Sequence, residues 1–164
     1  MRPERAAVRP GQESVWDYPR PPAIEAVDAP VSIAFGGVRI VDTRDVVRVL
    51  ETSHPPVYYL PVDAFAPGSL VPASGASFCE YKGAARYFDV VGGGRTAPRA
   101  AWNYPNPSPG YEALRDRVAV YAGPMDACTF DGEAVVPQPG GFYGGWITSG
   151  VAGPFKGGPG SMGW

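Results

Sequence analysis

The sequence contains little histidine and little cysteine. Its 164 residues include one histidine, His54, and two cysteines, Cys79 and Cys128, which lie far apart and form no C-x-x-C pair. A structural zinc site of the ribbon type needs paired cysteines, so we expect no metal ion. A disulfide between the two cysteines is open on sequence grounds, but a reducing compartment argues against it.

Clustered positive charge and long apolar runs are also missing. The formal net charge is −2, and arginines occur singly. Duplex nucleic acid and anionic membranes both attract clustered Lys and Arg, so we expect neither as a partner. No apolar run is long enough to cross a membrane, and Met1 to Arg5 lead into no signal core. These absences predict a cytoplasmic protein.

Glycine, proline and aromatic residues are abundant. The chain has 22 glycines and 20 prolines, a content that approaches that of disordered chains. However, 45% of the residues are hydrophobic and 12% are aromatic, which supplies enough apolar surface for a folded core. The length suits one domain. We therefore expect a single folded domain rich in turns.

Short apolar runs separated by turn residues predict a mainly β fold of short antiparallel strands with one or two short helices. Residues 31–35 and 38–42 flank Gly36-Gly37 and predict a β-hairpin, as do residues 129–136 around Asp131-Gly132. Residues 45–51 fit a strand or a helical turn, and their β-branched content favours the strand. Further strands are expected over 57–60, 77–91 with a turn at 82–83, 100–104 and 118–121, and helical turns at 62–65 and after 110.

The two ends of the chain differ from its centre, residues 29–136. Residues 1–28 form a proline-rich arm, and we expect Trp16 and Tyr18 to attach it to the domain. Residues 137–164 contain ten glycines, four prolines and five aromatic residues. Such a tail is expected to wrap the domain surface, or to close over a pocket or a partner subunit.

The segment 51–61 is the most informative part of the chain, because it places His54 beside Pro55-Pro56 and the pair Tyr58-Tyr59. Proline fixes its own φ and disfavours the helical region for the residue before it, so His54 should lie in an ordered, extended loop. Histidine is the side chain whose ordinary pKa, roughly 6.5, lies near neutrality. His54 therefore either takes part in chemistry or recognition, or simply bonds a loop carbonyl.

Five blocks of the sequence resemble the bacterial domain-of-unknown-function family 427, from about Ser14 to Trp164. They are Gly36-Gly37-Val38, residues 51–59, residues 79–87, residues 101–105 and residues 153–160. The resemblance implies a compact β-tent fold, shared with the thalidomide-binding domain of cereblon and with methionine sulfoxide reductases of the B type. Those relatives often hold zinc with two cysteine pairs, which this chain lacks.

The family label also implies nucleotidyl transfer, but the sequence shows neither the paired acidic metal ligands of such enzymes nor a P-loop. Relatives commonly have the motif His-Cys-Pro-Tyr-Lys-Gly at the position where this chain has Phe78-Cys79-Glu80-Tyr81-Lys82-Gly83. The second histidine and the proline are therefore missing, and a mechanism with two histidines is not expected.

The candidate site gathers around the same blocks. His54 and Glu51 are the candidate acid and base, and Cys79 is a candidate nucleophile if it meets His54 in space. Alternatively, Cys79 is a buried apolar residue without a catalytic role. Lys82 could bind a carboxylate or phosphate as a point charge, or it could be a solvated turn residue. Aromatic rings with hydroxyl groups suit a flat or cationic small molecule. The candidate ligand-binding residues are Tyr58, Tyr59, Tyr81, Lys82, Tyr87, Trp102 and Tyr104.

Three functions follow as hypotheses. The first is a small-molecule-binding β domain with an aromatic pocket around His54, with a cofactor-free acid/base reaction as its chemistry, since no cofactor motif is present. The second is a non-enzymatic module that self-associates or binds a protein through residues 137–164. The third is nucleotidyl transfer, as the family label implies.

Overall fold

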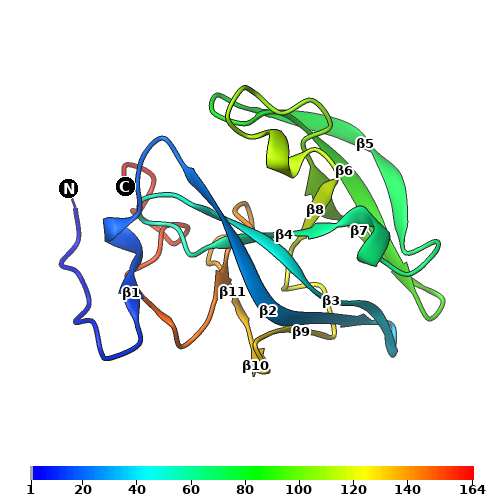
Figure 1. The fold of residues 1–164 in the computed structure, drawn as a ribbon, viewed down its shortest axis with the longest axis horizontal. Helices are drawn as coiled ribbons and strands as arrows, with labels where there is room; N and C mark the ends of the chain where they lie inside the picture. Colours follow the sequence, from blue (N-terminus) through cyan, green and yellow to red (C-terminus); the bar gives the residue numbers. More distant parts are fainter. Residues whose placement is uncertain (1) are drawn as a thin grey trace.

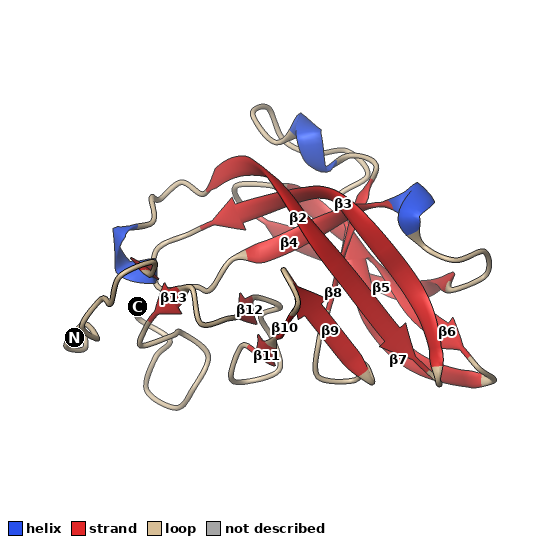
Figure 2. Cartoon of the chain, turned by 60° about the horizontal axis from the view of Figure 1, so that its bottom comes forward, coloured by secondary structure: helices blue, strands red, loops and turns tan. Residues whose placement is uncertain are grey.

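The computed structural model describes residues 2–164, which form a mainly β structure, as predicted. Nine strands make one antiparallel sheet in the order β10-β9-β2-β3-β4-β8-β7-β6-β5 (Figures 1 and 2). Their bounds are β2 Ala23–Phe35, β3 Val38–Leu50, β4 Val57–Pro61, β5 Leu70–Cys79, β6 Gly83–Gly92, β7 Arg95–Asn103, β8 Arg117–Val120, β9 Ala127–Phe130 and β10 Glu133–Ala134.

Four short strands and three single helical turns complete the fold. β1 Glu13–Ser14 pairs with β13 Val151–Ala152, and β11 Val136–Pro137 pairs with β12 Trp146–Ile147. The 3₁₀ turns are η1 Val15–Asp17, η2 Val62–Ala64 and η3 Glu112–Leu114. None of these helices, within residues 2–164, is long enough to cross a membrane.

The β2–β3 hairpin forms at the predicted Gly36-Gly37 turn. Both glycines have positive φ, +64° and +79°, which suits a tight two-residue hairpin turn. A Cβ atom at Gly36 would lie 1.9 Å from the carbonyl oxygen of Gly92, so the turn also packs against the β6–β7 connection. β2 begins at Ala23, earlier than the apolar pattern indicates. None of residues 23–28 is buried, so this half of the strand carries no apolar alternation, and a register shift follows Asp28.

Side chains on the two faces of the sheet form different clusters. The main core lies on one face and includes Ile33, Leu60 and Val118, together with Trp146 from the C-terminal segment. Tyr59, Trp102 and other aromatic residues gather in a second cluster. Successive residues of a strand point to opposite faces, so each central strand contributes to both clusters.

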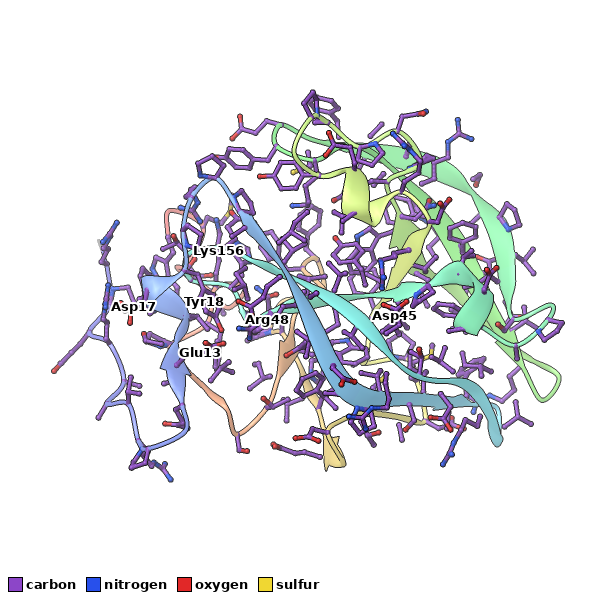
Figure 3. All side chains as sticks on the ribbon, viewed as in Figure 1. Glu13, Asp17, Tyr18, Asp45, Arg48 and Lys156 are labelled. Carbon is purple, nitrogen blue, oxygen red and sulfur yellow. The ribbon has the colours of Figure 1, made fainter. Side chains whose placement is uncertain are left out.

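The two ends of the chain pack together beside the sheet (Figure 1). Val15, Trp16 and Tyr18 form a third apolar cluster with Leu50 and Val151. Glu13 accepts hydrogen bonds from Arg48 at 2.6 Å and from the Tyr18 hydroxyl at 2.7 Å, and Figure 3 shows the three side chains side by side. Burial works against ionisation of Glu13, but these bonds lower the pKa of its carboxyl group.

Candidate functional site

A cavity of about 310 Å³ lies over the face of the sheet that carries the second apolar cluster. Its lining alternates along the strands, with Val57 and Tyr59 on β4 and with Ala85 and Tyr87 on β6. Trp102 of β7 is the direct cross-strand partner of Tyr87. Period-two alternation on adjacent strands therefore builds the aromatic wall of this cavity.

Nine of the ten predicted site residues line the cavity. They are Glu51, His54, Tyr59, Cys79, Tyr81, Lys82, Tyr87, Trp102 and Tyr104. Tyr58 does not line it, because it points to the opposite face of β4. There its ring stacks on Phe130 at 4.6 Å between centroids, within the main core. Burial raises the pKa of the Tyr58 hydroxyl to about 12.

The backbone on both sides of His54 is held by segments that are remote in sequence. Ser53 has a positive φ of +72°, an uncommon conformation for a residue with a side chain. Its N–H donates to the carbonyl of Val15 at 3.0 Å, and its carbonyl accepts from the N–H of Lys156 at 2.9 Å. The N-terminal arm and the C-terminal segment thus fix the loop that carries His54.

Gln138 fixes the tautomer of His54. The Oε1 atom of Gln138 accepts a hydrogen bond from the N–H of Gly145 at 3.0 Å, and its Nε2 donates to the carbonyl of Lys156 at 2.8 Å. These partners define the orientation of the amide. The same Nε2 lies 3.1 Å from Nδ1 of His54, which must therefore accept. Neutral His54 carries its proton on Nε2.

The protonated nitrogen of His54 is directed toward Glu51. Nε2 of His54 lies 3.6 Å from Oε2 of Glu51, too long for a direct hydrogen bond. Arg20 donates to the same oxygen at 3.2 Å and to the carbonyl of Thr52 at 2.9 Å. Within residues 2–164, Oε1 of Glu51 has no hydrogen-bond partner, so it is the oxygen available to a ligand.

His54 is neutral at physiological pH. Its side chain is buried, with the residue 7% exposed, and burial lowers its pKa from 6.5 to about 4. The charge of Glu51 opposes this shift, whereas the charges of Lys156, Arg20 and Lys82 reinforce it. At neutral pH His54 can therefore donate one hydrogen bond through Nε2, but it cannot accept a proton there.

Cys79 lines the cavity without forming the predicted pair with His54. Within the described residues its sulfur makes no hydrogen bond to the imidazole. His54 could not deprotonate the thiol in this arrangement, because Nδ1 is occupied by Gln138 and Nε2 already bears a proton. Cys128 lies apart in the main core, where burial raises the pKa of its thiol to about 12.

The sequence interpretation missed the residues that the C-terminal segment contributes. Tyr143 and Lys156 line the cavity, and Gln138 lies directly behind His54. The Tyr143 ring meets the imidazole edge to face, with centroids 4.7 Å apart. No periodic pattern indicates these positions. Their one visible signal is a Phe-Tyr pair between two Gly-Gly pairs, in a segment whose single charged side chain is Lys156.

A second cavity, of about 570 Å³, adjoins the first across Phe142 and Tyr143. Tyr121 and Tyr87 line both cavities, and the Tyr121 hydroxyl donates to the carbonyl of Phe142 at 2.9 Å. Burial raises the pKa of the Tyr121 hydroxyl, so it stays protonated and keeps this bond at neutral pH. The glycine-flanked segment is thus a wall between two spaces.

The chain has a mainly β fold with an aromatic-lined cavity on one face of its sheet. The chain belongs to the family described as Domain of unknown function (DUF427), whose model, NTP_transf_9, matches residues 23–131. This confirms the family resemblance seen in the sequence. The matched range contains Glu51, His54, Lys82 and Trp102 but not Gln138. A comparison with curated proteins finds no match.

Proposed function

We propose that this protein binds a small organic molecule in the aromatic cavity around His54. The observation that carries the proposal is the convergence, in one cavity, of the only histidine of the chain, a carboxylate and at least five aromatic rings. Its volume lies at the lower end of the range of ligand pockets, and a mainly apolar lining with a few polar groups is typical of them.

The polar groups of the cavity suit a cofactor-free proton transfer. Glu51 is the base, because it lines the cavity and its Oε1 has no hydrogen-bond partner within residues 2–164. Neutral His54 donates its Nε2 proton as a hydrogen bond to the ligand oxygen on which negative charge develops. The proton taken up by Glu51 returns to another atom of the ligand, so the reaction is an isomerisation and needs no oxidant or reductant.

A thermal-shift screen against a library of neutral, cationic and anionic metabolites tests this proposal, because a specific ligand raises stability by mass action. We expect ligands that stabilise the wild type and the surface control Arg115→Met, but not His54→Ala. Replacing Glu51 by Gln should keep binding and slow any turnover roughly 100- to 10,000-fold. A library without a single hit, or hits that bind His54→Ala equally well, would reject the cavity as the ligand site.

A non-enzymatic interaction module is the second candidate, favoured by exposed apolar side chains in the C-terminal segment. Phe142 is 71% exposed and Met162 is 91% exposed. Apolar side chains exposed to this extent are candidates for contact with another protein, and this function requires them to share one patch. Self-association through this segment predicts a concentration-dependent dimer in analytical ultracentrifugation that Phe142→Ser and Met162→Ser both weaken. A monomer at every concentration would argue against self-association.

Nucleotidyl transfer, the activity in the family label, stays a prediction. Within the part of the chain that the structure describes, no group of three or more His, Cys, Asp and Glu side chains is placed to hold a metal ion. Glu51, an acidic residue of the cavity, contacts Arg20. Titration with ATP or GTP and magnesium, followed by melting temperature, tests this activity directly, and the absence of any shift would count against it.

A further inference from the structure

Both lysines of the chain line the cavity. Lysine and arginine together number 14, and only Lys82 and Lys156 are lysines. The other basic residues are arginines, and none of them lines this cavity. The two flexible ammonium groups of the chain are therefore concentrated at one site, while arginines form the ion pairs elsewhere on the surface.

Lys82 has no counter-ion among residues 2–164, and most of its side chain is buried. The residue is 9% exposed, and its Nζ lies 5.8 Å from the centre of the Tyr104 ring. Within residues 2–164, its ammonium group forms no hydrogen bond and no ion pair. The turn that carries it is fixed, because the N–H of Ser108 donates to the carbonyl of Lys82 at 3.0 Å.

The Nζ atom of Lys82 opens into a cavity with aromatic walls, where the effective dielectric is lower than in bulk water and attraction to an anion is stronger. The Tyr104 ring attracts a cation more weakly than a carboxylate does, so it does not replace such an anion. An anion that arrives with the ligand would complete the interaction.

Lys156 and His54 add two more donors to the same cavity. Nζ of Lys156 lies 5.6 Å from the centre of the Tyr143 ring, the ring that also contacts His54. Its ammonium group donates one long hydrogen bond, of 3.4 Å, to a main-chain oxygen of Trp164. The positive charges of both lysines lower the pKa of His54, so all three groups share one electrostatic environment.

The acidic residues of the cavity do not neutralise these lysines. Glu51 is paired with Arg20 at 3.2 Å, and Glu80 is exposed at the rim. Neither carboxylate lies within ion-pair distance of Lys82 or Lys156 in the described residues. The ammonium groups of both lysines are therefore available to an anionic ligand, and the walls around them are aromatic.

We propose that the ligand is a small aromatic carboxylic acid, whose carboxylate is bound by Lys82 and Lys156, while the Nε2 proton of His54 is left for the oxygen on which negative charge develops. Its ring then lies against Trp102 and Tyr104, which face the same space. This inference rests on the proposed function of the cavity as a small-molecule site and specifies the class of its ligand. Charge-assisted hydrogen bonds supply the affinity for the anion, and ring contacts supply the preference for a flat molecule.

Isothermal titration calorimetry with benzoate, 4-hydroxybenzoate and phenylacetate tests the inference. Benzamide is the neutral control of the same shape, and phenyl phosphate is the alternative anion. We expect the carboxylates to bind the wild type and benzamide to bind at least tenfold more weakly. Lys82→Met and Lys156→Met should each weaken carboxylate binding roughly 10- to 100-fold. Arg115→Met removes one exposed positive charge outside the cavity and should leave the affinity unchanged.

Each outcome separates this inference from the proposed function. Benzamide binding as tightly as benzoate, or carboxylate affinity unchanged in both lysine variants, overturns the anion site. A preference for phenyl phosphate overturns the choice of carboxylate. If neutral or cationic metabolites bind and His54→Ala abolishes their binding, the proposed function holds and the inference fails. If no compound of any charge binds, both fail.

Circular dichroism confirms that each variant is folded. Lys156→Met, at a half-buried position, provides a second test should Lys82→Met not fold.

Discussion

At the scale of single residues, the buried imidazole of His54 has an unusual combination of contacts. One nitrogen accepts from an amide whose other atoms are fully engaged, and the other faces a carboxylate that an arginine already contacts. Such a histidine is a fixed hydrogen-bond donor rather than a proton shuttle. The sequence predicts a role for His54 as acid or base, and the contact of Gln138 with Nδ1 leaves only the Nε2 proton to be donated.

The ionisation of His54 should make stability depend on pH. Its pKa is 6.5 when unfolded and about 4 when folded, so the unfolded chain binds more protons between these values. The free energy of unfolding should therefore fall as pH drops from about 6.5 to about 4, by about 3 kcal/mol in total. Urea unfolding of the wild type and His54→Gln across this window measures the difference.

The control for this prediction lies in the chain itself, because His54 is its only histidine. In His54→Gln the free energy of unfolding should no longer change with pH above about pH 5, whereas the carboxyl groups should still make it change below that pH. Nitrogen NMR of the single imidazole should show a protonated Nε2 and an unprotonated Nδ1 at neutral pH. Parallel stability profiles, or a proton on Nδ1, would contradict the contacts described for Gln138.

Part of the site could be predicted from residue types, and part could not. The His54 loop, the turn at Lys82 and the aromatic strands are visible because each occupies a short segment with its own pattern. The choice between Tyr58 and Tyr59 depends on which face of β4 carries the cavity, and a single strand does not reveal that. Gln138 contacts His54, and Lys156 contacts Ser53, only through long-range hydrogen bonds, for which the sequence offers no local signal.

At the scale of elements, the strands were more predictable than the C-terminal segment. Glycine pairs and alternating apolar residues mark the hairpins, and both predicted hairpins form. Residues 137–164 carry no such alternation, yet they contribute two short strands, the wall between two cavities and a core residue, Trp146. Their structure is determined by the surfaces they contact, so composition alone could suggest wrapping but not its path.

Replacing either of two aromatic residues of this segment by alanine should change the free energy of unfolding by very different amounts. Trp146 is 1% exposed, packs on Tyr58, and donates from its indole nitrogen to the carbonyl of Val120 at 3.0 Å. Trp146→Ala should lower the free energy of unfolding by about 3–5 kcal/mol. The exposed Phe142 is the matched control, and Phe142→Ala should change it by less than about 0.5 kcal/mol. Urea unfolding compares the two, and equal losses would show that Trp146 does not support the core.

At the scale of the whole molecule, the arm, the His54 loop and the C-terminal segment are joined into one unit. The indole nitrogen of Trp16 donates to the carbonyl of Pro154 at 2.9 Å, and its ring lies 5.6 Å from that of Trp164. The preceding residue, Val15, accepts the N–H of Ser53, whose carbonyl in turn accepts from Lys156. Trp16 does not line the cavity, but these contacts connect it to two residues that do, His54 and Lys156.

Removing Trp16 should therefore loosen the cavity from a distance. In Trp16→Ala we expect faster amide hydrogen exchange at residues 51–56 and 146–156, with β5, β6 and β7 close to the wild type, because local units can open below the global unfolding energy. Ligand affinity should fall with it, since His54 and Lys156 lose the support of the arm. Val8→Ala, an exposed change in the same arm, is the control and should alter neither the exchange rates nor the ligand affinity.

A uniform increase in exchange over the whole chain would instead show that Trp16 contributes only to global stability. Unchanged exchange at residues 51–56 would mean that the arm does not hold the His54 loop.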